Sequence, residues 1–222
     1  MQPARRRGLA EEAADRIRDE ILSGRFAPGS ALREVELAAS LQVSRGSVRE
    51  GLAILEREGL VHSEWHRGTR IIELSETDIT EVYEVRAALD RLATLTAAER
   101  GREGQFDELD RLVAAMDREA RGPADGDRLV ALDIEFHDCV YAMAANGRLT
   151  NAWEAVRSQV HLFQAHRVRL SHEHYRTRVV DEHRELATLL RARRVEGLGD
   201  LAEEHVRSAS RGLIESLREL HR

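Results

Sequence analysis

Apolar residues recur with a period near 3.6 along almost all of the chain after residue 77, a pattern typical of amphipathic helices packed around a core. The three prolines, at positions 3, 28 and 123, leave long stretches open to helix formation. The periodicity predicts six helices in this part, at about 78–100, 105–120, 126–146, 149–169, 173–194 and 197–220. The fold is therefore expected to be mainly α-helical.

The first 75 residues show a different order of elements. Helices are predicted at about 9–23, 33–40 and 44–57, with Ser44 placed to cap the third. Residues 60–74, LVHSEWHRGTRIIEL, carry β-favouring residues on both sides of HRG, which predicts two short strands joined by a turn. Helix, turn, helix and hairpin in this order are typical of a winged helix-turn-helix that binds DNA.

A domain boundary is expected near residue 75. The predicted hairpin ends there, and the following SETD offers hydroxyl caps for the next helix. We therefore predict a winged DNA-binding domain at residues 1–75 and an all-helical bundle at residues 76–222.

The overall charge does not by itself indicate a nucleic-acid-binding protein. The net charge is −6 and the isoelectric point is about 6.0, and all 34 basic residues are arginine. Any DNA-binding surface must therefore be a local patch. In the third helix Arg45 and Arg49 point away from the apolar stripe of Val48, Leu52 and Leu55, although a charged surface helix explains this spacing equally well.

Location and redox state follow from features that the sequence lacks. Nothing resembles a secretory signal, and the longest stretch free of charged residues and histidine, Cys139 to Gly147, is too short to cross a bilayer. The single cysteine cannot form an internal disulfide. We expect a cytoplasmic protein without a membrane segment.

The segment from Ala27 to Val61, APGSALREVELAASLQVSRGSVREGLAILEREGLV, followed by HRGTRI, resembles the winged helix of GntR-type bacterial transcription regulators. Gly46 departs from the family pattern, where Thr or Pro is usual, and weakens the first turn of the third helix. The resemblance implies binding to double-stranded operator DNA through Arg33, Ser44, Arg45, Ser47 and Arg49, with His66 and Gly68 of the wing near the minor groove or backbone.

Three predicted helices of the second part carry polar residues within their apolar stripes. Asp133 and His137 share such a stripe, as do His183 and His205 on two later helices. A single inward histidine is most often a hydrogen-bonded core residue. Together, however, neutral imidazoles and an ionised carboxylate are ligands for divalent transition metals, and the i, i+4 spacing offers two of them from one helix.

The same residues resemble the FCD effector domain of FadR-like GntR regulators, together with VYEVRAALDRLA, DEHREL and EEHVRS. The resemblance implies a divalent ion held by Asp133, His137, His183 and His205, with Zn²⁺ as the first candidate and Ni²⁺ or Mn²⁺ as others. It also implies a small organic acid as effector and a homodimer. Six helices would place the domain in the VanR-like subgroup.

Arg86 is predicted to lie on an inward face, between Val82, Val85, Leu89 and Leu92. A buried guanidinium requires an anion, which is either an effector carboxylate or an internal acid such as Asp90 or Asp133.

The sequence is compatible with two functions. The first is a regulator whose operator binding responds to a small carboxylate, and it is not an enzyme. The second is a metal-dependent hydrolase that uses the Asp/His site to activate water. The sequence has no H-E-x-x-H motif and no clearly placed base to support the second function, which also leaves the winged domain unexplained. A third possibility, a purely architectural DNA-binding protein, does not explain the inward acid and imidazoles.

Overall fold

The computed structural model describes residues 8–64, 68–122, 126–170 and 172–220. The chain divides into two compact units, Met1–Leu74 and Ser75–Arg222, which are described separately below. The first contains a winged helix-turn-helix and the second a helical bundle, as the residue pattern predicts.

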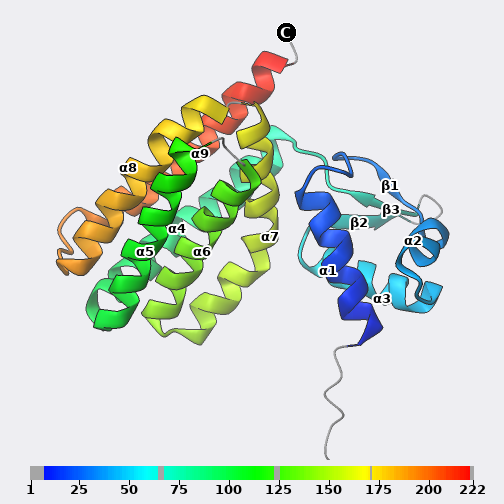
Figure 1. Ribbon diagram of the computed structural model, residues 1–222, viewed down its shortest axis with the longest axis horizontal. Helices are drawn as coiled ribbons and strands as arrows, with labels where there is room; N and C mark the ends of the chain where they lie inside the picture. The colour runs from blue at the N-terminus through cyan, green and yellow to red at the C-terminus, as the bar shows by residue number, and fades with distance from the viewer. Residues whose placement is uncertain (1–7, 65–67, 123–125, 171, 221–222) are drawn as a thin grey trace, which may run out of the picture. The chain divides into compact units, whose positions relative to one another are not determined.

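The first unit combines three helices with a small sheet (Figure 1). Its elements are α1 (Leu9–Leu22), β1 (Ala31–Leu32), α2 (Glu34–Leu41), α3 (Arg45–Arg57), β2 (Val61–Glu64) and β3 (Gly68–Ile71). The strands are antiparallel in the order β1-β3-β2, with Ala31 opposite Arg70 and Val61 opposite Ile71. The pattern of the sequence did not predict β1, because two residues are too few to show alternation.

Local interactions explain where α3 begins and where it ends. The Ser44 hydroxyl accepts a hydrogen bond from the Ser47 amide at 3.0 Å, which confirms the predicted cap. At the other end Gly59 has a φ of +70°, a conformation that costs glycine little, and its amide donates to the Glu56 carbonyl. Between these ends the predicted stripe of Val48, Leu52 and Leu55 is buried.

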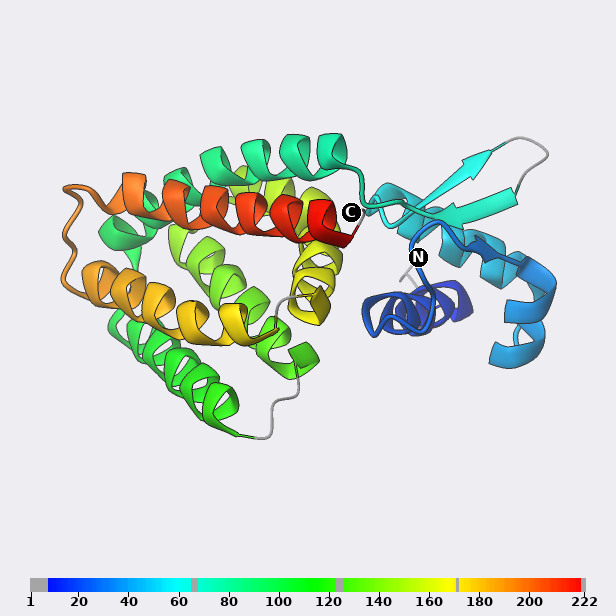
Figure 2. The same cartoon turned by 90° about the horizontal axis from the view of Figure 1, so that it is seen from above.

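The second unit has six helices within its described residues, in agreement with the periodicity. They are α4 (Glu76–Arg100), α5 (Glu103–Arg121), α6 (Gly126–Ala144), α7 (Gly147–Leu170), α8 (His172–Arg191) and α9 (Leu198–Leu220). Figure 2 shows α4 and α9 side by side and antiparallel. None of the helices in the described part of the chain is long and apolar enough to span a membrane.

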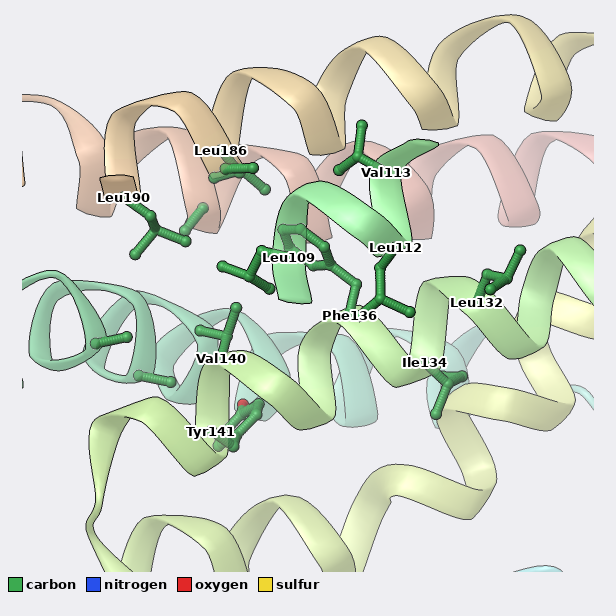
Figure 3. Close-up of a cluster of buried hydrophobic side chains, with 14 of the residues drawn as sticks. Leu109, Leu112, Val113, Leu132, Ile134, Phe136, Val140, Tyr141, Leu186 and Leu190 are labelled. Atoms are coloured by element: carbon green, nitrogen blue, oxygen red, sulfur yellow. The ribbon is translucent and has the colours of Figure 1, made fainter. Parts of the chain in front are cut away.

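Side chains from α5, α6 and α8 meet in the core of this bundle. Figure 3 shows Leu109 and Leu112 of α5, Phe136 of α6 and Leu186 of α8 in this cluster. The ring of Phe136 also meets the imidazole of His183 edge-on, with 4.7 Å between centroids. The apolar core is therefore continuous with a buried polar cluster.

The sequence-based assignment of the inward face of α4 is wrong. Val85 and Leu92 are 51% and 50% exposed, whereas Arg86 is fully buried together with Tyr83 and Ala87. At about 100° per residue, positions 83, 86, 87 and 90 share one face and positions 85 and 92 lie on another. Arg86 is thus buried, as predicted. It lies on the face of α4 that packs against the other helices, however, whereas Val85 and Leu92 lie on the exposed face.

Close packing of α1 on α3 depends on Gly51. A Cβ at this position would lie 2.9 Å from the Ala10 carbonyl oxygen and 3.1 Å from the Ala14 amide nitrogen. We expect Gly51→Ala to lower the free energy of unfolding by about 1–3 kcal/mol through overpacking, measured by urea denaturation. Gly104→Ala is the control, because nothing lies within 4 Å of that site; equal effects of the two substitutions would contradict this account.

Candidate metal centre and nucleic-acid interface

Four potential ligands converge inside the second unit. Asp133 and His137 come from α6, His183 from α8 and His205 from α9. One ligand atom from each lies within 4.8 Å of those of the other three, and none of the four residues is more than 8% exposed. The structure therefore brings together the four residues that the sequence singled out, from three helices.

Two of the imidazoles are oriented by acceptors at Nδ1. His183 donates from Nδ1 to the Val179 carbonyl oxygen at 2.7 Å. His205 donates from Nδ1 to Oε2 of Glu182 at 2.9 Å. Because a carbonyl and an ionised carboxylate only accept, each ring carries a proton on Nδ1, and Nε2 is the atom that is directed at the cluster.

The third imidazole is oriented by Asp90 of α4. His137 Nδ1 lies 3.2 Å from Asp90 Oδ2, and the Tyr141 hydroxyl donates to Oδ1 of the same carboxylate. Burial favours the neutral acid, but the charges of His137 and Arg86 outweigh it and lower the pKa of Asp90. Asp90 is therefore an ionised carboxylate that lies against the ring of His137.

Four inward-facing atoms of the cluster make no hydrogen bond among the residues that the structure describes: Nε2 of His137, His183 and His205 and Oδ2 of Asp133. The nearest charged contact is within the cluster, where His183 Nε2 lies 3.1 Å from Oδ1 of Asp133. A buried polar atom without a partner destabilises a fold by about 1–3 kcal/mol. Three imidazole nitrogens and a carboxylate oxygen form a common donor set for a divalent transition metal, and an Nδ1 proton donated to a carboxylate or carbonyl is typical of metal-binding histidine. The residues thus fit such an ion.

The protonation states also suit metal binding. Burial lowers the pKa of His205 to about 4, so its ring is neutral near pH 7. Burial opposes ionisation of Asp133, but nearby His183, His137 and Arg86 outweigh it and lower the pKa of that carboxyl. The cluster therefore offers the anionic oxygen of Asp133 and the neutral nitrogen of His205.

Arg86 lies fully buried near the cluster. Its Nε is 3.4 Å from Asp90 Oδ2, yet none of its three guanidinium nitrogens makes a hydrogen bond within the described residues. The rings of Tyr83 and Trp153 each lie 5.7 Å from its Cζ. Arg86 is therefore paired in charge with Asp90 but keeps unused donors.

Sequence reasoning did not assign Asp90 and Glu182 their roles beside the imidazoles. The spacing of Arg86 and Asp90 at i, i+4 suggested their ion pair, but nothing in the sequence indicated that Asp90 also reaches His137. Glu182 precedes His183 in the chain and yet orients His205. Both contacts depend on how helices pack, which spacing along one helix cannot reveal.

The basic residues predicted to contact DNA are exposed around the start of α3. Arg49 forms a two-point ion pair with Glu34, from Nε to Oε1 at 3.0 Å and from Nη2 to Oε2 at 2.9 Å, and Arg45 Nη2 lies 3.6 Å from Oε2. The hydrogen bond from Arg49 lowers the pKa of Glu34. Arg33 pairs separately with Glu36 at 2.8 Å. Glu34, which the sequence did not single out, thus holds Arg45 and Arg49 together.

The remaining predicted contacts are distributed between the helix start and the wing. Ser44 and Ser47 lie at the N-terminus of α3, and their hydroxyls are 2.9 Å apart. Gly68 begins β3 with a φ of +76°, and a Cβ at this position would meet no described atom within 4 Å. His66 lies outside the described residues.

Comparison with known proteins agrees with both halves of this description. Residues 9–71 match the family described as bacterial regulatory proteins, gntR family, and residues 81–208 match the FCD domain. The FCD match alone covers more than half of the chain.

Individual relatives span most of the chain. The HTH-type transcriptional regulator YdhC of Bacillus subtilis (strain 168) is 24% identical over 86% of this chain and 83% of its own length. A protein of Paenarthrobacter nicotinovorans, described as a D-xylose utilization operon transcriptional repressor, is 36% identical over 68% of this chain and 66% of its own length. A GntR-type regulator of Rhodococcus sp. RHA1 has the same fold, with a TM-score of 0.77 and 24% identity over 93% of this chain and 97% of that one.

Proposed function

Because this chain belongs to the GntR family of DNA-binding transcription regulators and carries an FCD effector domain, we propose that a small organic acid controls its binding to operator DNA. The acid would bind at a metal-containing pocket in the second unit. The observation that carries this proposal is the convergence of three buried histidine Nε2 atoms and Oδ2 of Asp133, none of which makes a hydrogen bond among the described residues.

A divalent ion, with Zn²⁺ as the first candidate, would be held by Asp133, His137, His183 and His205. When bound, the ion supplies a Lewis-acidic centre that attracts a carboxylate. The chain's own contribution is to present imidazoles in fixed orientations, through Glu182 at His205 for example, and to connect α6, α8 and α9 at one point.

Arg86 is proposed to bind the effector carboxylate, because its guanidinium is buried and retains unused donors. The cavity beside the cluster has a volume of only about 10 Å³, which holds roughly one water molecule. An organic acid would therefore enter only if the lining helices move. This coupling between occupancy and helix positions is a physical basis for regulation.

Operator binding is assigned to the start of α3 and to the wing. Arg45 and Arg49 would exchange their contacts with Glu34 for base edges or phosphates, and Arg33 would add a phosphate contact. Ser44 and Ser47 would place hydroxyls and the helix N-terminus near the backbone. An operator-binding regulator would act in the cytoplasm.

A homodimer is proposed through α4. Val85 and Leu92 are half exposed seven residues apart, with Leu89 half-buried between them, so one side of this helix presents an apolar stripe to solvent. Exposed apolar stripes of this kind mark protein interfaces. A two-fold axis here would supply the second recognition helix that short inverted-repeat operators need.

The hydrolase alternative receives no support from the site. Two further carboxylates lie next to the imidazoles: Glu182 accepts a hydrogen bond from Nδ1 of His205, and Oδ2 of Asp90 lies 3.2 Å from Nδ1 of His137. Neither is therefore free to act as a general base in the arrangement seen here.

The assignment of Arg49 can be tested by Arg49→Ala. We expect a loss of about 1–3 kcal/mol in operator affinity if the residue reads a base, with the loss focused on one base pair. Gel-shift titration measures it, and Arg111→Ala, which removes an exposed arginine paired with a helix acid in the other unit, is the matched control. Unchanged operator affinity in Arg49→Ala would remove this residue from the interface.

The metal site can be tested by His183→Ala. Elemental analysis should show metal content falling from near one per chain to near zero, whereas His62→Ala, at an exposed histidine, should leave it unchanged. Metal binding should also stabilise the native protein, by about 4 kcal/mol at a thousandfold excess over Kd, so chelation should lower its Tm and not that of the variant. Full stoichiometry in His183→Ala would show that the four-residue site is wrong.

The dimer face can be tested by Leu92→Glu, which places a charge in the proposed apolar contact. Light scattering should show a dimer for the native protein and a shift towards monomer for the variant, because burying an unpaired charge is costly. Val195→Glu alters another exposed apolar residue, at 44% exposure, and should leave the mass unchanged. A Leu92→Glu protein that remains dimeric would place the interface elsewhere.

A further inference from the structure

A second buried arginine lies beside the candidate metal centre. Arg167 of α7 is 9% exposed, and no carboxylate pairs with it among the residues that the structure describes. Its polar contact is a long hydrogen bond from Nη1 to Oε1 of Gln164 at 3.5 Å, and its Cζ lies 5.3 Å from the ring of Tyr175. A guanidinium so enclosed and without a counter-ion points to an anionic ligand.

Arg167 and the proposed metal ligands border the same small cavity. Its lining includes Asp133, Gln164, Arg167, Tyr175, Arg178, Val179, Glu182 and His205. The most exposed of these charged residues, Arg178, forms an ion pair with Glu182 at 2.6 Å and adds no net charge. The cavity therefore connects the metal-binding cluster to Arg167.

Two buried phenols add donors at this end of the cluster. The hydroxyls of Tyr83 and Tyr175 have no hydrogen-bond partner in the part of the chain that the structure describes. Burial raises the pKa of both, and the positive charges of Arg86 and Arg167 offset this only in part, so both phenols stay protonated. Arg86, Arg167, Tyr83 and Tyr175 together therefore offer more donors than the described residues have acceptors for, since their nearest polar contacts are Gln164 at 3.5 Å from Arg167 and Asp90 at 3.4 Å from Arg86.

The formal charges indicate how many negative charges the ligand carries. A divalent ion with Arg86 and Arg167 supplies four positive charges, and Asp133 and Asp90 supply two negative ones. An excess of two positive charges would remain in a region shielded from water. Because isolated buried charge is strongly unfavourable, a ligand with two negative charges balances this region better than one with a single charge.

We infer that the effector is a dianion, a small diacid with one carboxylate at the Asp133–histidine cluster and the other between Arg86 and Arg167, and that Arg167 selects diacids over monoacids. This inference rests on the proposed metal-containing effector pocket. It extends that proposal by naming the class of ligand and by adding Arg167, Tyr83 and Tyr175 as binding residues.

Calorimetric titration of the zinc-loaded full-length protein tests the inference with matched pairs of acids. Malate is compared with 2-hydroxybutyrate and 2-hydroxyglutarate with 2-hydroxyvalerate, which differ by one carboxylate, and D-xylose serves as a neutral compound. At least one diacid should bind about 10- to 100-fold more tightly than its monoacid, the difference expected for charge-assisted hydrogen bonds.

Variants of α7 show whether Arg167 causes this preference. Arg167→Gln should reduce the ratio of diacid to monoacid affinity to near one and keep its zinc content, while Arg167→Lys should retain part of the ratio. Arg169→Gln, which alters an exposed arginine two residues along the same helix, should keep the native ratio. If Arg167→Gln fails to fold, as judged by circular dichroism, the Lys variant and the native acid pairs still decide the matter.

The outcomes separate this inference from the proposal on which it rests. Equal binding of diacids and monoacids would overturn the dianion and leave a metal-bound carboxylate effector intact. A preference that persists in Arg167→Gln would remove Arg167 from the site. Zinc-loaded protein that binds none of the acids, or only D-xylose, would contradict both the inference and the carboxylate effector.

Discussion

Three helices of the second unit meet at a point where several buried polar atoms make no hydrogen bond to any described residue. Nε2 of His137, His183 and His205 and the Asp133 carboxylate face one another from α6, α8 and α9. At Nδ1, His183 and His205 donate hydrogen bonds and His137 lies 3.2 Å from Asp90. Such an arrangement destabilises the bundle unless something binds there. The packing of the helices, the charge of the cavity and the proposed response to effector all depend on how these four groups are satisfied.

Asp90 connects this point to the rest of the pocket. The same carboxylate lies 3.2 Å from His137, lies 3.4 Å from Arg86 and accepts a hydrogen bond from Tyr141. A ligand that attracts Arg86 would thus act on an acid that orients one of the imidazoles. Since the cavity holds about one water molecule, any larger ligand must also displace its lining helices, and binding is inseparable from a change in packing.

Much of the fold could be predicted from the sequence, because long helices repeat their apolar spacing many times. The six helices of the second unit were predicted in this way, and the caps at Ser44 and Ser75 were predicted from the hydroxyl residues that precede their helices. The inward placement of His183 and His205 followed from the same spacing. Strand β1 was missed because its two residues carry no period, and its pairing with β3 is set by the tertiary fold. The inward face of α4 was assigned wrongly because its exposed side is also apolar, at Val85 and Leu92.

The least predictable parts were contacts between residues far apart in the chain. Nothing in the sequence indicated that Glu182 orients His205 or that Glu34 holds Arg49, because each contact joins two helices. Arg167 was not singled out, since an arginine in a helical stripe is normally a surface residue. Only its low exposure and lack of a counter-ion in the described structure make it a candidate for ligand binding.

X-ray absorption spectroscopy of untagged protein, purified without chelator and loaded with one equivalent of zinc, tests the central claim most directly. We predict a spectrum with the outer-shell scattering of three imidazoles, zinc–nitrogen distances of about 2.0–2.1 Å and additional oxygen ligands. A zinc ion surrounded by oxygen alone, without imidazole scattering, would contradict the account. The buried histidines and Asp133 would then have to be satisfied without a metal.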